Sequence, residues 1–364
     1  MPPKTTLWPL EDHTRGKHMV LKNYMNAWLP ILRSGYERVL FIDAFAGPGK
    51  YAGGEDGSPV IALKSLINHS GQQRMRGEMT YMFIEKDPDR KEHLDDVVKQ
   101  MKHEIPSNCN ILIYNATFDG KLTEVLNKIE EQRRRLAPAF VMIDPFGVSG
   151  TPMEVIRRIL ANPSTEVYIS FMYDAINRFR SQPNFETHLD DLFGCPDWRD
   201  GLQIPEGIQR KIFFYDLYEK SLRRAGAEHV LHFELYRDER LIYAIFFATQ
   251  HEKGCDVMKK AMWKTAPFGD FMFKSGTANQ LTLGIETVNT SLLRKALHEE
   301  FGDNGWVRIE SIENFMKTDK TEFHTGHLKK QTLVPMEDEG EIEVDPSTRN
   351  RRRTFPKGTR LRFI

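Results

Sequence analysis

The chain has 364 residues, of which 40% are hydrophobic and 11% aromatic, and its 51 basic and 51 acidic side chains give no formal net charge. This length allows two or three domains with a sizeable core. The neutral balance excludes binding of nucleic acid through overall charge, so any such surface must be local.

The three cysteines are far apart and form no CxxC pair, which argues against disulfides and against a metal site. We therefore predict no bound metal and a reducing, cytoplasmic location. The sequence starts without an apolar stretch of signal-peptide type, and no window has the roughly 20 apolar residues of a membrane span. We expect no membrane partner.

The spacing of apolar residues predicts alternating helices and strands, as in a sheet with helices on both faces. The predicted helices cover 12–32, 58–67, 88–102, 121–135, 151–161, 208–225 and 254–263, and the predicted strands cover 39–42, 80–88, 110–118, 139–147 and 165–179. Pro30 predicts a bend or an end of the first helix. Two further strands, 229–237 and 241–250, predict a hairpin that ends the sheet in an antiparallel manner, and 181–207 predicts an irregular insert.

The first predicted strand ends in Asp43 and continues as Phe45-Ala46-Gly47-Pro48-Gly49. Two glycines let the backbone pass close to a ligand, although a simple tight turn is the alternative. The Lys and Ser/Thr of a phosphate loop are missing, which argues against nucleotide hydrolysis. The stretch resembles the first motif of class I S-adenosylmethionine (SAM) methyltransferases. The resemblance implies that Asp43, Phe45, Ala46, Gly47 and Gly49 surround the methionine half of SAM.

Acids also end the next two strands. Glu85, followed by Lys86, has the position from which a carboxylate accepts ribose hydroxyls; the alternative is that it only favours the dipole of the next helix. Methyltransferase resemblance implies that Asp119 binds the adenine amino group. Ser58 could reach a ligand, or it could cap the helix that Pro59 begins.

The fourth strand ends in Asp144-Pro145-Phe146-Gly147, at the edge of a sheet where ligands bind. This looks like a shortened form of the Asp-Pro-Pro-aromatic motif of amino methyltransferases, with one proline missing. The resemblance implies that Asp144 orients an exocyclic amine beside the cofactor and that Phe146 stacks on the base.

Cationic groups stand where a helix dipole disfavours them. His13, Lys17 and His18 lie near the start of the first helix, which indicates a nearby anion or ligand; a solvated helix start is the alternative. Arg178 could fix an anionic substrate group, pair with a site carboxylate, or lie on the surface.

The tail predicts a second domain, 286–364, after a first domain of residues 1–285. Three predicted helices (292–302, 309–317 and 321–336) followed by strands 340–344 and 359–364 give the order of a winged helix-turn-helix. Its basic residues suit nucleic-acid phosphates, and a protein-docking role is the alternative. They are His324, His327, Lys329 and Lys330 on the third helix and Arg349, Arg351, Arg352, Arg353, Lys357, Arg360 and Arg362 on the wing.

With these pieces together, the chain resembles the three-Cys-motif partner protein family (TcmP) over nearly its whole length. The resemblance rests on HTRGKHMVLKNYMNAWLPIL, FIDAFAGPGKY with GEDGSPVIAL, FIEKD, VMIDPFG, FMYDAINRF, YAIFFATQHEKGCDVMKKAMW and FHTGHLKKQTLVPMEDEGEIEV. It implies a methyltransferase-like fold and a three-cysteine partner protein similar to radical-SAM enzymes. It also supports the site residues His13, Lys17, His18, Ser58 and Arg178.

The resulting hypothesis is a SAM-dependent methyltransferase that acts on nucleic acid or a nucleotide-like substrate, with Asp144 as the orienting acid and Lys17 or His18 beside it. The alternative is a non-catalytic protein that binds SAM or a nucleotide and docks to a radical enzyme.

Overall fold

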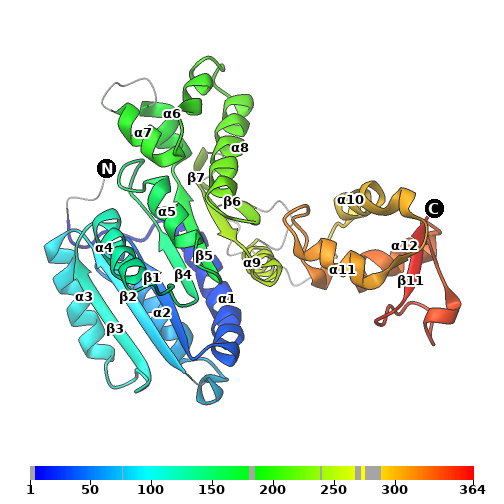
Figure 1. Cartoon of the computed structure of the whole chain (residues 1–364), viewed down its shortest axis with the longest axis horizontal. Helices are drawn as coiled ribbons and strands as arrows, with labels where there is room; N and C mark the ends of the chain where they lie inside the picture. The colour runs from blue at the N-terminus through cyan, green and yellow to red at the C-terminus, as the bar shows by residue number, and fades with distance from the viewer. Residues whose placement is uncertain (1–4, 76, 180–184, 238–239, 267–271, 275–287) are drawn as a thin grey trace.

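The computed structural model of the protein describes residues 5–75, 77–179, 185–237, 240–266, 272–274 and 288–364. Its larger part is built on one sheet (Figure 1). The strands are β1 (Arg38–Asp43), β2 (Glu78–Glu85), β3 (Cys109–Asn115), β4 (Ala139–Ile143), β5 (Thr165–Phe171), β6 (His229–Arg237), β7 (Arg240–Thr249) and β8 (Met272–Lys274). Their order across the sheet is β3-β2-β1-β4-β5-β7-β6-β8.

The five strands from β3 to β5 run parallel, and β7 pairs antiparallel with both β5 and β6. The predicted hairpin at the end of the sheet is therefore confirmed. All residues of β4 and β5 are buried, because helices cover both faces of the sheet. The predicted α/β sheet with helices on both faces is therefore confirmed.

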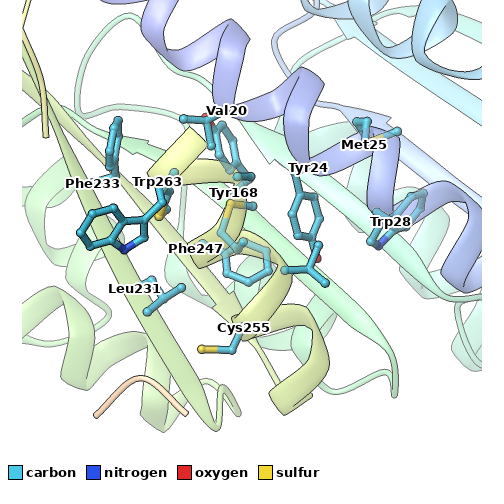
Figure 2. Packing of buried hydrophobic residues seen from close by; sticks show 14 of the residues in the cluster. Val20, Tyr24, Met25, Trp28, Tyr168, Leu231, Phe233, Phe247, Cys255 and Trp263 are labelled. Atoms are coloured by element: carbon cyan, nitrogen blue, oxygen red, sulfur yellow. The ribbon is translucent and has the colours of Figure 1, made fainter. Parts of the chain in front are cut away.

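Two layers of helices complete the larger part. The helices are α1 (Asp12–Gly35), α2 (Ser58–Ile67), α3 (Pro88–Met101), α4 (Phe118–Glu131), α5 (Met153–Leu160), α6 (Tyr173–Phe179), α7 (Glu186–Phe193), α8 (Ile208–Arg224) and α9 (Glu252–Thr265). Helices α1, α2, α3 and α9 share a core with one face, and α4, α5, α7 and α8 share a core with the other. Figure 2 shows the first core, where the ring of Tyr24 in α1 lies 5.4 Å from that of Phe247 in β7.

Several predicted boundaries are wrong. Helix α1 continues through Pro30 to Gly35, held by the burial of Trp28 and Leu29 just before the proline. Strand β5 ends at Phe171, and the residues after it form α6. Strand β3 ends at Asn115, because Thr117 accepts the Gly120 N–H and caps α4.

The predicted irregular insert is also wrong for its described residues, 185–207. It contains α7 and a 3-10 helix, Pro196–Leu202. Leu189, Leu192 and Trp198 are buried, so this segment packs as part of the fold. Residues 181–184 of the predicted insert lie outside the described residues.

The C-terminal part has its own small sheet, of order β10-β11-β9. Its elements are α10 (Ser291–Phe301), β9 (Val307–Arg308), α11 (Ile309–Lys317), α12 (Val334–Glu339), β10 (Ile342–Val344) and β11 (Arg360–Phe363). The predicted helix 321–336 is broken into a 3-10 helix (Thr325–His327), a π-helix (Lys329–Leu333) and the start of α12. The winged-helix assignment and the boundary near 286 stay predictions, since 275–287 lie outside the described residues.

A buried lysine joins the two parts. The Lys259 ammonium of α9 is 0% exposed and donates to the carbonyl oxygens of Met316 (2.5 Å), Thr318 (2.7 Å) and Thr321 (3.1 Å). These carbonyls lie at and beyond the end of α11, where a cation also complements the helix dipole. Trp263 adds a hydrogen bond from its indole N–H to the Glu322 carbonyl, at 2.8 Å. The Met and Trp side chains of α9 are buried in the core. In the described ranges, none of the helices is long and apolar enough to cross a membrane.

We expect Lys259→Met to lower the free energy of unfolding by about 3 kcal/mol, because three buried carbonyl groups lose a charged donor. Thermal unfolding measures the change. Lys260→Met is the matched control, since Lys260 is the exposed neighbour on the same helix. Equal shifts in the two variants would contradict the role of Lys259.

Candidate functional site

A cavity of about 980 Å³ opens at the carboxyl ends of β1 to β5. It is the edge at which open α/β sheets bind ligands. Six of the predicted site residues line it: Phe45, Glu85, Lys86, Asp119, Phe146 and Arg178. The other predicted site residues, His13, Lys17, His18, Asp43, Ala46, Gly47, Gly49, Ser58 and Asp144, are not among its lining residues.

The glycine loop needs its glycines for two different reasons. Gly47 (φ +62°) and Gly49 (φ +80°) have left-handed backbone conformations that favour glycine. A Cβ atom on Gly49 would also lie 2.7 Å from a methyl group of Leu94 in α3. Gly49 therefore allows close packing of the loop on α3. Gly47 lies next to Trp8, because a Cβ atom on Gly47 would be 3.7 Å from the indole ring.

Glu85 fixes the glycine loop to the end of β2. Its carboxylate accepts the N–H of Gly47 on one oxygen and the N–H of Asp87 on the other, both at 2.8 Å. Neither predicted role included this bridge. Each oxygen keeps a further lone pair, and Glu85 lines the cavity, so the carboxylate can still accept a ligand hydroxyl.

Asp43 is a buried carboxyl group with spare acceptor capacity. It is 0% exposed, and burial raises its pKa to about 7 against the lowering effect of the nearby Ser58 hydroxyl and of the hydrogen bond from the Phe45 N–H. Its Oδ2 atom has no hydrogen-bond partner among the described residues. The alternative that Ser58 caps its helix is wrong: Ser58 is the first residue of α2, and Gly57 precedes it in the cap position.

Asp144 forms an ion pair with Lys17 between β4 and α1. The Lys17 side chain is 5% exposed and its ammonium lies 5.4 Å from the centre of the Tyr243 ring. Burial alone would raise the pKa of Asp144, but the charge and the hydrogen bond of Lys17 outweigh it, so this pKa lies below its usual value. Asp144 is therefore a carboxylate at neutral pH.

The start of α1 is buried, so the alternative of a solvated helix start is wrong. Burial and the repulsion of Lys17 lower the pKa of His18 to about 3, which makes its imidazole neutral at pH 7. Burial also lowers the pKa of His13, although Glu11 lies 3.0 Å from its Nε2 atom. Of the three predicted cationic groups only Lys17 carries a charge, and its anion is Asp144.

The remaining predicted residues are accessible. Phe146 is 39% exposed at the mouth of the cavity. Arg178 is exposed and pairs at 2.5 Å with Asp174, a carboxylate that lines the same cavity and also binds Arg240 at 2.9 Å. Of the three alternatives predicted for Arg178, the structure therefore shows the pairing with a carboxylate of the site.

Three contributors were missed from the sequence. Trp8 and Tyr51 pack edge to face, and the Arg90 guanidinium lies 4.9 Å from the Trp8 ring. Trp8 and Arg90 belong to segments without a recognised motif, and Tyr51 ends the quoted stretch FIDAFAGPGKY but was assigned no role. Only the strand-end acids carried a signal strong enough to mark this edge of the sheet.

The basic residues of the tail are largely paired with acids. Arg353, Arg360 and Arg362 lie 2.5–2.6 Å from Asp338, Asp345 and Glu343, and Arg349 pairs with Glu337. Arg352 lies within 4 Å of both Glu337 and Asp338, Lys329 lies 2.8 Å from Glu313, and Arg351, Lys357 and Lys330 are exposed. His327 is buried against Trp263, at 4.6 Å between ring centres, and His324 stacks on it, so the expected phosphate contact of His327 is wrong.

Among the described residues, no group of three or more His, Cys, Asp or Glu side chains could hold a metal ion. No protein-family model matches the chain, and no curated protein matches it.

Solved structures give a weak likeness. Trm1 from Pyrococcus horikoshii with S-adenosyl-L-methionine is 13% identical, with a TM-score of 0.38; the match covers 71% of this chain but only 62% of that protein. The O-methyltransferase from Bacillus cereus with S-adenosylhomocysteine (SAH) is 13% identical, with a TM-score of 0.32, over 63% of this chain and 80% of that one. The METTL16 methyltransferase domain is 12% identical, with a TM-score of 0.31, over 62% and 66%. A likeness at this level assigns no activity.

The raised pKa of Asp43 predicts a pH-dependent stability. The folded chain holds a proton on Asp43 up to about pH 7, whereas the unfolded chain releases it near 3.8. This contribution is complete below about pH 4 and is lost as pH rises through about 7, by up to about 4 kcal/mol. We expect Asp43→Asn to lose less stability than the native chain between pH 5 and pH 8, as measured by urea unfolding.

Glu166 provides a comparison in the same assay, because burial raises its pKa to about 7 as well. Glu166→Gln should reduce the same slope. A slope that Asp43→Asn leaves unchanged, while Glu166→Gln reduces it, would contradict the assignment to Asp43.

Proposed function

We propose that the protein is a SAM-dependent methyltransferase that acts on nucleic acid or a nucleotide-like substrate. The observation that carries this proposal is the cavity of about 980 Å³ at the carboxyl ends of β1 to β5. Acidic residues at and after the ends of β2 and β3, Glu85 and Asp119, line it. The volume lies at the upper end of the range for cofactor pockets, so a cofactor and part of a substrate fit together.

The residues present suit the groups of SAM. The orphaned Oδ2 atom of Asp43 is a buried acceptor beside the glycine loop, where a cationic amino group would be stabilised. Glu85 offers lone pairs to the ribose hydroxyls, and Asp119 offers a carboxylate to the adenine amino group. When bound, SAM would supply an electrophilic methyl group next to a sulfonium.

The chain's own task is to position the nucleophile. Asp144 is a carboxylate at neutral pH and can accept an N–H of an exocyclic amine, which leaves the nitrogen lone pair free to attack the methyl carbon. Formation of the N–C bond would break the methyl–sulfur bond and leave SAH, and the resulting acidic ammonium would release its proton to Asp144 or to water. His18, a neutral imidazole, can accept a hydrogen bond but is a weak base.

One observation favours the second candidate, a non-catalytic partner that binds SAM or a nucleotide. Lys17 already occupies one oxygen of Asp144 and leaves less room for a substrate amine. We further propose that the chain is related to the TcmP family and that a three-cysteine, radical-SAM-like protein is its partner. The quoted sequence motifs support this proposal.

Calorimetric titration with SAM, and in parallel with ATP, tests the cofactor. We expect saturable binding of SAM and at least tenfold weaker binding by Glu85→Ala, which loses both the ribose acceptor and the bridge to the glycine loop. Glu78→Ala is the control, because Glu78 lies at the opposite end of the same strand, where its carboxylate pairs with Arg38 and accepts a hydrogen bond from Asn110. Binding of ATP but not SAM would overturn the proposal.

Asp144→Ala separates the two candidates. A methyltransferase should lose about 100-fold or more of its transfer rate to RNA or DNA while it still binds SAM. The measurement is transfer of labelled methyl groups together with calorimetry on the same preparations. If Asp144→Ala instead leaves a partner-dependent activity unchanged, the docking role is favoured.

A further inference from the structure

The segment 5–11 crosses the candidate site in front of α1, and its Trp8 indole lies in a box of three side chains. The ring centres of Tyr51 and Phe146 are 5.8 Å and 5.9 Å from that of Trp8, with interplanar angles of 86° and 72°. The Arg90 guanidinium lies 4.9 Å from the Trp8 ring and 5.7 Å from the Phe146 ring. Gly47 forms the floor of the box, since a Cβ atom there would lie 3.7 Å from the indole.

Trp8 contacts residues from two parts of the site. Arg90 and Phe146 line the large cavity. Tyr51 belongs to the other part, because its ring lies 5.7 Å from His18, next to the Lys17–Asp144 pair. The indole thus contacts both Phe146 at the cavity and Tyr51 near the pair.

Within the described residues, the contacts of this segment are irregular and local. It has no regular secondary structure, and the Trp8 carbonyl accepts one hydrogen bond, from the Ala52 N–H at 3.0 Å. The Thr5 carbonyl is 3.5 Å from Arg90, a long hydrogen bond, and Glu11 pairs with Arg237 at 2.7 Å near the start of α1. The indole itself is only half-buried. Such a segment can leave the site without disturbing the sheet.

We propose that the Trp8 indole occupies the binding subsite of a purine ring of the substrate, and that the segment 5–11 is the exchangeable lid of this subsite. That the bound purine belongs to a methyl acceptor rests on the proposed function, whereas the binding of a purine in this subsite does not. Indole and purine are both flat, fused rings of five and six members, so they fill similar space. Edge-to-face contacts with Tyr51 and Phe146 and the nearby guanidinium of Arg90 suit any such ring.

The test compares binding of single-stranded RNA by the native chain and by Trp8→Ala. Fluorescein-labelled decamers of adenylate (A10) and uridylate (U10) are titrated and followed by anisotropy. Removing the indole should tighten the binding of A10 at least threefold and change that of U10 less than twofold. Tyr36→Ala is the matched control, because Tyr36 is an exposed aromatic residue just after the end of α1. Equal or weaker binding of A10 by Trp8→Ala would overturn the proposal.

A second measurement follows Trp8 directly. Trp28, Trp198 and Trp263 are at most 5% exposed, so in Trp306→Phe the fluorescence that acrylamide quenches comes from Trp8. Quenching should increase when A10 or adenosine monophosphate (AMP) displaces the indole. An increase with AMP assigns the purine to a free nucleotide, and an increase with A10 alone assigns it to a strand. No increase with either ligand overturns the exchange.

Calorimetry with SAH on the same proteins keeps this inference separate from the proposed activity. If SAH does not bind but Trp8→Ala binds A10 more tightly, the methyltransferase proposal is overturned and the purine subsite is supported. If SAH binds but Trp8→Ala does not bind A10 more tightly, the purine subsite is overturned and the methyltransferase proposal is supported.

Discussion

The ion pair between Lys17 and Asp144 is the interaction on which the site depends. It joins the first turns of α1 to the end of β4, two segments 127 residues apart in the sequence. Removing one partner would leave a largely buried charge without compensation, which costs about 3–5 kcal/mol in comparable pairs. The pair therefore fixes where α1 begins, and with it the positions of His13, His18 and the segment that precedes the helix.

The surroundings of the pair control the protonation of the whole site. Burial favours the neutral forms of His18 and Asp43, while the direct contact with Lys17 keeps Asp144 charged. The Lys17–Asp144 pair thus lies close to a neutral His18 imidazole and to an Asp43 carboxyl that is mostly protonated below pH 7. A positively charged ligand beside Asp43 would change this balance, because it would favour the carboxylate and release a proton.

The sequence was sufficient for the sheet and for the acids at its edge. Runs of apolar residues marked β1, β2 and β4, and the residue after each run identified Asp43, Glu85 and Asp144, because a strand that ends in an acid is a local pattern. Side-chain partners were not predictable from it. The bridge from Glu85 to Gly47 and the pairing of Lys17 with Asp144 join segments that meet only in the folded chain.

The tail shows the same limit. A count of basic residues on the wing suggested a phosphate-binding surface, but β10 and α12 bring Glu343, Glu337 and Asp338 beside those arginines. Similarly, His327 is a polar residue in a segment rich in basic side chains, which suggested a surface position, but Trp263 of α9 covers it. Charge in a sequence is a property of segments, whereas charge on a surface depends on which segments become neighbours.

The contacts of Lys259 have a mechanical consequence. Three hydrogen bonds from one buried ammonium leave the end of α11 little freedom to rotate on α9. We therefore expect the C-terminal part to move together with α9 rather than independently of it. Any molecule that it grips would meet the carboxyl edge of the large sheet at a fixed distance and orientation, so its reach, and not only its chemistry, would select the atom that enters the site.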